Sequence, residues 1–362
     1  MSPLRWIAKF AGFCFASAVA FILVLSVLEG FCRVLPCLWE ASKIVSEGSF
    51  ARSRRSHLQS DSLLGWTNIP NIFIKDMYGP GVYLRTNSQG SRNNEDFPPH
   101  PPRGKVRIVC SGDSMTFGYG VDNDHTWCQG LADQDERLET VNMGQILYAL
   151  DHMYLRYMRD GVKLDPDIHI LALGDVEFQR LTQKDFYGMA KPTLQLQDGK
   201  LIAASLPRPS RRAAAYLVPL THLLRNRLQL LGALTRLRRR SYNPEQNKAL
   251  AVSIFESLQE AMRKNGGSFV VVFLPRIIHR ANPLRDREME FLSAELKKKG
   301  ILTVDLVRDF RAWPTDYQDR IFLEDSHYSE EGNRAVAALI YNRLLAFPQT
   351  AAKLAAAGKA KK

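Results

Sequence analysis

Residues 105–121 read KVRIVCSGDSMTFGYGV, and this stretch decides the fold. An apolar run at residues 106–110 ends at the small and polar residues Ser111-Gly112-Asp113, the pattern of a buried strand that feeds a turn. A serine at a strand-to-helix turn stays exposed and has backbone N–H groups beside it. Ser114 is therefore the candidate nucleophile, and the glycines that follow it let a ligand approach the backbone closely.

Apolar strands alternate with helices from residue 105 to residue 347. The expected strands are residues 106–110, 140–142, 167–173, 268–274 and 301–307. The expected helices are residues 127–137, 148–159, 284–299 and 330–345, the last one capped by Ser329. Strands that are apolar throughout favour an α/β fold with a parallel sheet covered on both faces. Such sheets place their sites beyond the carboxyl ends of the strands.

The natural complement of Ser114 lies near the C-terminus, in Asp325-Ser326-His327. A nucleophilic serine needs a neutral imidazole to take its proton, and a carboxylate to hold the tautomer of that imidazole. A lone histidine is more often a capping or surface residue, but with Ser114 earlier in the chain a catalytic His327 is favoured. Activity is then expected to rise with pH through about 6.5, where an imidazole loses its proton.

These motifs resemble the SGNH (GDSL-type) hydrolases, and especially their membrane-anchored branch, which includes esterases and O-acetyltransferases of bacterial envelope polysaccharides. The resemblance covers residues 64–345 and includes the lead-in segments 64–66 and 87–92. It implies a three-layer, flavodoxin-like parallel sheet. It also implies Ser114 as nucleophile, His327 as base and Asp325 as the group that orients the base.

The same resemblance implies where an oxyanion is bound. Gly144 matches the glycine of the second motif, so the implied oxyanion hole consists of the N–H groups of Ser114 and Gly144. The third motif departs, because Gly174-Asp175-Val176-Glu177 has valine where the family has a donating asparagine. Losing one such donor costs about 2.7–4 kcal/mol, or roughly 10²–10³ in rate. The two acids of this stretch would also set negative charge near the oxyanion. The replacement donors that we consider are Asn142, Gln145 and Gln179.

The chain is expected to begin with a membrane anchor. Residues 10–28 are 19 positions without a charge, and a helix of that length covers roughly the 30 Å of a bilayer's hydrocarbon. The expected organisation is an anchor at 1–33, a connector and irregular lead-in at 34–104, the α/β domain at 105–347 and a loose basic tail at 348–362. Charges flank the apolar run almost evenly, so the orientation follows the resemblance: a single-pass protein of the bacterial inner membrane with a periplasmic domain.

A basic amphipathic insertion is expected at residues 207–247. Nine arginines lie between residues 208 and 240, and leucines at helical spacing separate them. Two interpretations stay open: a helix packed on the core with solvated arginines, or a helix that lies on anionic lipid or a membrane partner. The net charge of +12 also favours anionic surfaces, but no nucleic-acid-binding motif accompanies it, so we expect no nucleic acid partner.

The expected function is acyl-ester chemistry on a cell-envelope or exopolysaccharide glycan, by an O-acetyl esterase or an O-acetyltransferase. An integral membrane acyltransferase or a polysaccharide assembly protein would be its partner. The alternative is a catalytically degenerate SGNH-like domain that serves as a membrane-anchored assembly or glycan-binding module, and a lipase ranks last. No cofactor is expected, because nucleotide-binding glycine patterns are missing, and no metal, because the histidine and cysteine spacings do not fit one. The five cysteines predict no disulfide framework.

Overall fold

The computed structural model describes residues 57–181, 183, 185–186, 189–207, 244–277 and 286–360, with six positions between residues 13 and 24. The described residues from His57 onward belong to one compact unit. The six N-terminal positions are helical and exposed. The rest of the expected anchor, the connector up to residue 56 and the arginine-rich segment 208–240 lie outside the described residues. Within the part of the chain that is described, no helix combines the length and the apolar character needed to cross a bilayer.

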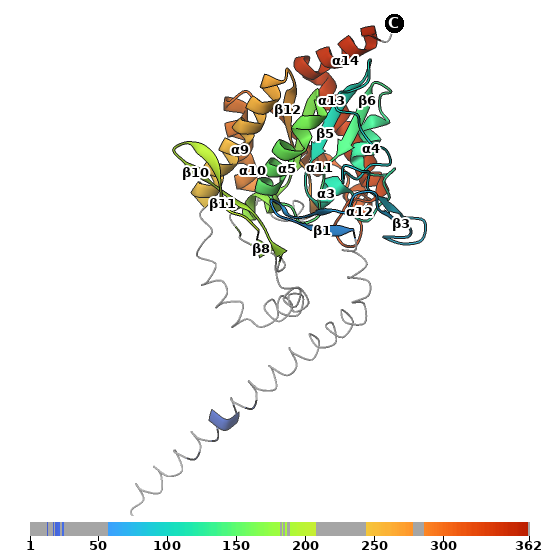
Figure 1. Cartoon of the computed structure of the whole chain (residues 1–362). Coiled ribbons are helices and arrows are strands. Elements are labelled where there is room, and N and C mark those ends of the chain that lie inside the picture. Colours follow the sequence, from blue (N-terminus) through green and yellow to red (C-terminus); the bar gives the residue numbers. More distant parts are fainter. Residues whose placement is uncertain are drawn as a thin grey trace, which may run out of the picture. The chain divides into compact units, whose positions relative to one another are not determined.

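A parallel sheet forms the centre of this unit (Figure 1). Its strands, among the described residues, are β5 (Val106–Ser111), β6 (Leu138–Asn142), β7 (Ile168–Leu173), β12 (Ser268–Phe273) and β13 (Leu302–Asp305). Their order is β13-β12-β7-β5-β6, so the chain starts at β5, adds β6 on one side and then builds outward on the other. This is the flavodoxin-like order, which confirms the α/β fold class with a parallel sheet. Every residue of β5 and β7 is buried, as expected for a sheet covered on both faces.

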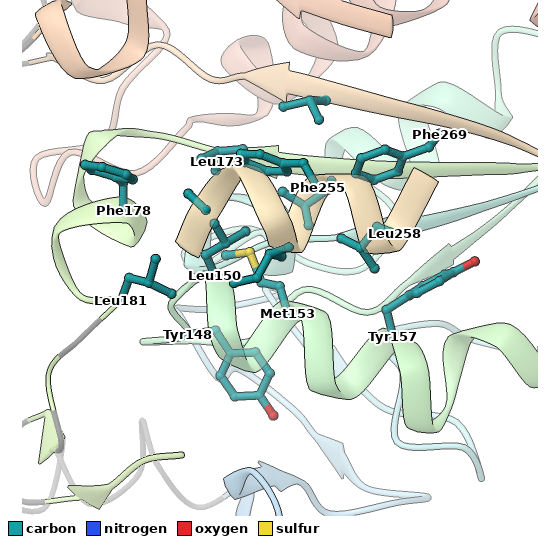
Figure 2. Packing of buried hydrophobic residues seen from close by; sticks show 14 of the residues in the cluster. Tyr148, Leu150, Met153, Tyr157, Leu173, Phe178, Leu181, Phe255, Leu258 and Phe269 are labelled. Carbon is teal, nitrogen blue, oxygen red and sulfur yellow. The ribbon is translucent and has the colours of Figure 1, made fainter. Parts of the chain in front are cut away.

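One face of the sheet packs against α5 (Leu150–Arg159), α9 (Pro244–Lys264) and α10 (Asp286–Lys298). Figure 2 shows the contact, in which side chains of α5 and α9 gather beneath the strands: Leu150, Met153 and Tyr157 from α5, Phe255 and Leu258 from α9, and Leu173 and Phe269 from the sheet. The core on this face is therefore built from segments more than a hundred positions apart in the chain.

The opposite face packs against α4 (Trp127–Ala132), α11 (Leu306–Ala312), α13 (Glu330–Ala346) and α14 (Pro348–Ala360). Side chains alternate between the two faces of a strand, so Ile108 and Cys110 belong to this second core while Val109 belongs to the first. The result is the expected three-layer arrangement. The hydroxyl of Ser329 caps α13 by accepting from the N–H of Gly332 at 3.2 Å, which confirms the predicted start of this helix.

Two of the longer helices differ from the expectation. The 21-residue α9 was not predicted, and it begins at Pro244, inside the expected insertion 207–247. The expected loose tail is wrong over α14, where Leu354 is 2% exposed and its carbonyl accepts from Arg137 at 3.0 Å. Alanine-rich sequence has high helix propensity, and the apolar side chains of α14 supply the packing that holds it.

The lead-in, residues 57–104, packs against the central sheet and is bonded to its edge strand β6. It contains two small antiparallel pairs, β1 (Leu58–Asp61) with β2 (Gly65–Asn68) and β3 (Phe73–Ile74) with β4 (Leu84–Arg85). Beyond β4 the chain runs along the open edge of β6, where Arg92 N donates to Asn142 O at 3.0 Å and Asn93 Nδ2 donates to Thr140 O at 2.9 Å. The remaining described elements are η1 (Gly161–Leu164), β8 (Asp185–Phe186), β9 (Met189–Ala190), the hairpin β10 (Thr193–Gln197) with β11 (Lys200–Ser205), and α12 (Thr315–Arg320).

Candidate active site

Ser114 lies where the sequence predicts it, at the turn that leaves the carboxyl end of β5. It is the first residue of the one-turn helix α3 (Ser114–Phe117), whose cap is Asp113. Asp113 Oδ1 accepts the N–H of Met115 at 2.9 Å. A Cβ on Gly112 would lie 1.9 Å from the hydroxyl oxygen of Thr116, so this turn requires glycine.

The structure brings His327 to Ser114. Its Nε2 lies 2.9 Å from Ser114 Oγ, within the range for direct proton transfer. His327 sits in a short loop closed by the bridge between Phe322 and Tyr328, and its carbonyl accepts from Leu323 N at 2.7 Å. Ser326, beside it, has the left-handed φ of 70°, a strained value for a residue with a side chain. The loop therefore places the imidazole next to the hydroxyl of Ser114.

Asp325 lies close to the imidazole but is not aligned with it. Its Oδ1 is 3.1 Å from Nδ1 of His327 and also accepts the backbone N–H of His327 at 3.2 Å. Nδ1 makes no hydrogen bond to the described residues, because the carboxylate lies off the direction of the ring N–H. The side chain of Asp325 is 40% exposed. A small rotation of either group would complete a Ser–His–Asp relay.

A row of aromatic rings leads away from the imidazole. The ring of Tyr119 packs on His327 with centroids 4.6 Å apart, and Tyr78 packs on Tyr119 at 4.9 Å. Gly120, at φ 94°, lies against Leu323 in the loop of His327, where a Cβ would come within 2.4 Å of Leu323 Cδ1. The loop after α3 and the loop of His327 thus pack directly on each other.

Arg92 holds the loop after α3 from below. It is 1% exposed, and its guanidinium donates to three backbone carbonyls, those of Phe117 (2.6 Å), Gly118 and Val121, and to Asn123 Oδ1 at 3.0 Å. The sequence marks Arg92 only as part of a lead-in motif. Its structural task is to fix the backbone next to the nucleophile.

The oxyanion side of the site is less complete. The N–H of Gly144 donates to Asn142 Oδ1 at 3.0 Å, and a Cβ on Gly144 would lie 2.3 Å from Phe117 N. Glycine is thus required for close packing against α3, while a role of its N–H in binding an oxyanion stays a prediction. Asn142 Nδ2 donates to Thr116 O at 2.9 Å, which leaves it unsuited to replace the missing donor. Gln145 Nε2 is buried without a partner among the described residues.

The departing third motif contains a buried ion bridge. Glu177, in α6 (Asp175–Gln179), is 0% exposed, and its Oε2 accepts the N–H of Gly174 at 2.6 Å. Arg276, just beyond β12, places Nη2 2.6 Å from Glu177 Oε1 and 2.8 Å from Asp113 Oδ2. We name the set Asp113, Arg276 and Glu177 the arginine bridge. Val176, next to Glu177 in the sequence, has an apolar side chain and so cannot donate a hydrogen bond to an oxyanion.

The two carboxyl groups of the arginine bridge titrate in opposite directions. Burial raises the pKa of Glu177 to about 8, because the nearby Asp113 adds to the effect and Arg276 only partly opposes it. Burial also raises the pKa of Asp113, but Arg276 and the hydrogen bonds to the carboxylate outweigh it and hold that pKa well below its usual range. At neutral pH, Asp113 is therefore charged and Glu177 is protonated. The raised pKa of Glu177 reduces the negative charge that this residue would place near an oxyanion.

A second serine–histidine pair lies inside the sheet. Ser111 Oγ and His169 Nε2 are also 2.9 Å apart, but the two residues are 2% and 0% exposed. The His169 ring stacks on Tyr157 at 3.6 Å, and burial lowers the pKa of His169 well below its usual value. The distance between the two side chains would suit proton transfer, but both are buried and a substrate could not reach them.

One cluster with metal-ligating side chains occurs among the described residues, formed by Asp122, His125 and Glu330. Their ligand atoms lie within 4.8 Å of one another, and His125 Nδ1 is 2.8 Å from Asp122 Oδ1. Sequence spacing did not reveal this cluster, since Glu330 is distant in the chain. It is partly exposed and explained as an ion-paired surface group, so we assign no metal to it.

No family model and no curated protein matches the chain. Solved structures do match. A member of the lipolytic protein G-D-S-L family from Veillonella parvula is 14% identical, with a TM-score of 0.38, and the match covers 66% of this chain and 97% of that chain. An acetyl xylan esterase is 12% identical, with a TM-score of 0.42, covering 66% and 98%. A lipase/acylhydrolase from Enterococcus faecalis is 15% identical, with a TM-score of 0.37, covering 66% and 95%. A further match is a putative GDSL-like lipase from Parabacteroides merdae, 12% identical with a TM-score of 0.43, covering 68% of this chain and 98% of that chain.

Proposed function

We propose that this chain is a serine-dependent acyl-ester enzyme. The observation that carries the proposal is the 2.9 Å distance between Ser114 Oγ and His327 Nε2, in a place that is partly open to solvent. A hydroxyl next to a neutral imidazole, with a carboxylate near the other ring nitrogen, is the arrangement that activates a serine.

The reaction proceeds in two halves. His327 takes the proton of Ser114 while Oγ attacks the ester carbonyl carbon, and the negative charge moves to the carbonyl oxygen. The intermediate collapses when the bond to the alcohol oxygen breaks, and the imidazolium returns the proton to that leaving oxygen. Water, or a sugar hydroxyl, then attacks the carbonyl carbon of acyl-Ser114 while His327 takes its proton. The bond to Ser114 Oγ breaks, and the imidazolium returns the proton to Oγ. Hydrolysis and transfer therefore use the same residues and differ in the second acceptor.

For the substrate we propose O-acetyl esters of a cell-envelope or exopolysaccharide glycan. The support is the resemblance of the motifs to the membrane-anchored SGNH branch, together with the uncharged residues 10–28 and the net charge of +12, which suits an anionic surface. In this proposal the chain is anchored once in the bacterial inner membrane, with its α/β unit in the periplasm. It would work beside an integral membrane acyltransferase or a polysaccharide assembly protein.

Labelling with a fluorophosphonate probe tests the chemistry. The wild-type chain is expected to label, and Ser114→Ala to lose the label completely. Ser111→Ala is the matched control, because it removes a hydroxyl at the same 2.9 Å from an imidazole but inside the sheet, and it should label as wild type does. A wild-type chain that never labels contradicts the proposal. Acetate release from an acetylated glycan, compared with acetyl transfer to a deacetylated one, then separates esterase from transferase.

A second candidate is a degenerate domain that binds or assembles without catalysis. Two features favour it: Val176 in place of a donor, and the N–H of Gly144 already paired with Asn142. Complementation of a deletion strain decides between them. Rescue by Ser114→Ala as well as by Ser111→Ala would favour the degenerate module, whereas rescue by Ser111→Ala alone would favour the enzyme.

A further inference from the structure

We propose that Arg276 is a positioning residue, which bridges Asp113 and Glu177 and thereby directs the hydroxyl of Ser114 at His327. The inference rests on the proposed acyl-ester chemistry at Ser114. Arg276 belongs to none of the sequence motifs. It lies next to the third motif, in which Val176 replaces the asparagine.

Arg276 touches the turns that carry the site. Its guanidinium reaches Asp113 at the end of β5 and Glu177 after the end of β7. It also lies against Gly174, where a Cβ would come within 2.7 Å of Nε. The preceding residue, Pro275, accepts from the hydroxyl of Tyr328 at 2.6 Å, which ties this segment to the neighbour of His327 in sequence. The guanidinium thus spans the space between the nucleophile's turn and the altered third motif.

Two acceptors compete for the proton of Ser114. Oγ lies 2.9 Å from Nε2 of His327 and 3.4 Å from Oδ2 of Asp113. Only a hydroxyl that points at the imidazole is ready for proton transfer. Arg276 Nη2 also contacts Oδ2 of Asp113, at 2.8 Å. This oxygen therefore accepts a charged hydrogen bond from the guanidinium and competes less for the hydroxyl of Ser114. Without the guanidinium, Asp113 becomes the stronger attraction for the hydroxyl, and Ser114 turns away from its base.

Charge balance supports the same assignment. The bridge combines one carboxylate, one guanidinium and the protonated Glu177, so it has no net charge at neutral pH. A neutral bridge does not oppose the negative charge that develops on the substrate's carbonyl oxygen. Other groups with charge or titration near the bridge are Arg180 at the end of α6, Tyr328, and Asp325 with His327 in the loop before α13. Arg180 adds positive charge near both carboxyl groups, and Arg276 contacts both of them.

A mutant cycle in the full chain separates positioning from simple structural support. We would measure the rate of fluorophosphonate labelling for Arg276→Met, Asp113→Asn, the double variant, and Arg276→Lys. A displaced nucleophile loses about 10²-fold in rate, so Arg276→Met should fall by that factor. The double variant should recover most of the loss, because an uncharged amide at position 113 competes less for the hydroxyl and can still cap α3. Arg276→Lys keeps the positive charge but not the planar guanidinium with its several donors, so its labelling rate should lie between those of Arg276→Met and the wild type.

The control is Arg343→Met, which removes an arginine that pairs with Asp309 on the surface, and it should label as wild type does. A double variant no faster than Arg276→Met would overturn the proposal, since a purely structural loss is not repaired by a second deletion. Wild-type rates in Arg276→Met would overturn it too, while leaving the proposed function intact. If wild-type protein fails to label at all, both the function and this inference fall together.

Discussion

Nε2 of His327 and Oγ of Ser114 lie 2.9 Å apart although 213 positions separate them in the chain. The sheet brings Ser114 to the carboxyl end of β5, and the loop between Phe322 and Tyr328 delivers His327 to the same end. The proximity depends on the whole fold, whereas Asp325, two residues from His327, depends only on a local turn. Mutations of His327 and of Asp325 should therefore have different effects.

We predict a larger loss for His327→Asn than for Asp325→Asn. Removing the base should reduce fluorophosphonate labelling by about 10²–10⁴-fold. Asp325 is off the axis of the ring N–H and 40% exposed, so the loss from its amide variant should be smaller. Labelling rates at pH 7.5 measure both. Equal losses would show that the carboxylate aligns with the ring during the reaction.

Restoring the missing donor should increase activity. Val176→Asn puts an amide at the third-motif position, and a working oxyanion donor is worth about 10²–10³ in rate. Hydrolysis of p-nitrophenyl acetate is the measurement, with Val176→Leu as the control for a change of shape. An unchanged rate in the asparagine variant would mean that the oxyanion is stabilised elsewhere.

We predict that the difference in stability between the wild type and Glu177→Gln depends on pH. The pKa of Glu177 is about 8 in the fold and 4.5 as the reference value. Between these values the folded state binds a proton that the unfolded state lacks, so this group's contribution to stability falls as pH rises from about 4.5 to 8. Glu177→Gln removes that titration. Its melting temperature, relative to wild type, should be higher at pH 8.5 than at pH 5.

The control for this prediction is Glu260→Gln, which changes an exposed glutamate paired with Arg263. Its difference from wild type should stay constant between pH 5 and pH 8.5. A constant difference for Glu177→Gln as well would contradict the assignment of a protonated Glu177.

Gly144 and Gly358 should respond in opposite ways to alanine. A Cβ on Gly144 meets the backbone at Phe117 N at 2.3 Å, and forced packing of this kind costs about 1–3 kcal/mol or more. A Cβ on Gly358 in α14 meets Arg137 Nη1 at 3.4 Å, an ordinary contact, and alanine is favoured over glycine in a helix by about 1 kcal/mol. Urea unfolding should thus show loss of stability for Gly144→Ala and a gain for Gly358→Ala. Equal stability of the two variants would contradict the packing argument.

The elements that the sequence predicted are those with strong local signals. The apolar runs of the central strands and the turn after residue 110 specify the sheet and the place of Ser114, because buried parallel strands are apolar throughout. The helix α9 was missed although Leu250, Ile254, Phe255, Leu258 and Met262 have helical spacing. That signal was available, but it lies directly after the arginine-rich segment and was not separated from it.

The arginine bridge could not have been predicted. Arg276 is 163 positions from Asp113 and 99 from Glu177, and no local pattern links them. The protonated state of Glu177 depends on complete burial, which a single sequence does not encode in its charges. The pairing of Gly144 with Asn142 is equally a matter of atomic position. The motifs therefore predict which groups react, whereas the charges around those groups follow from the fold and could not be predicted.

The contacts of Arg92 limit where the α/β unit can be truncated. Its guanidinium is the donor for carbonyls on either side of Gly118, although it comes from the lead-in, outside the α/β domain expected at residues 105–347. A fragment trimmed to residue 105 would keep every reacting group and lose the brace that holds their scaffold. Cleavage in front of β5 is therefore expected to weaken the support of the loop after α3, although Ser114, Asp325 and His327 all stay in the fragment.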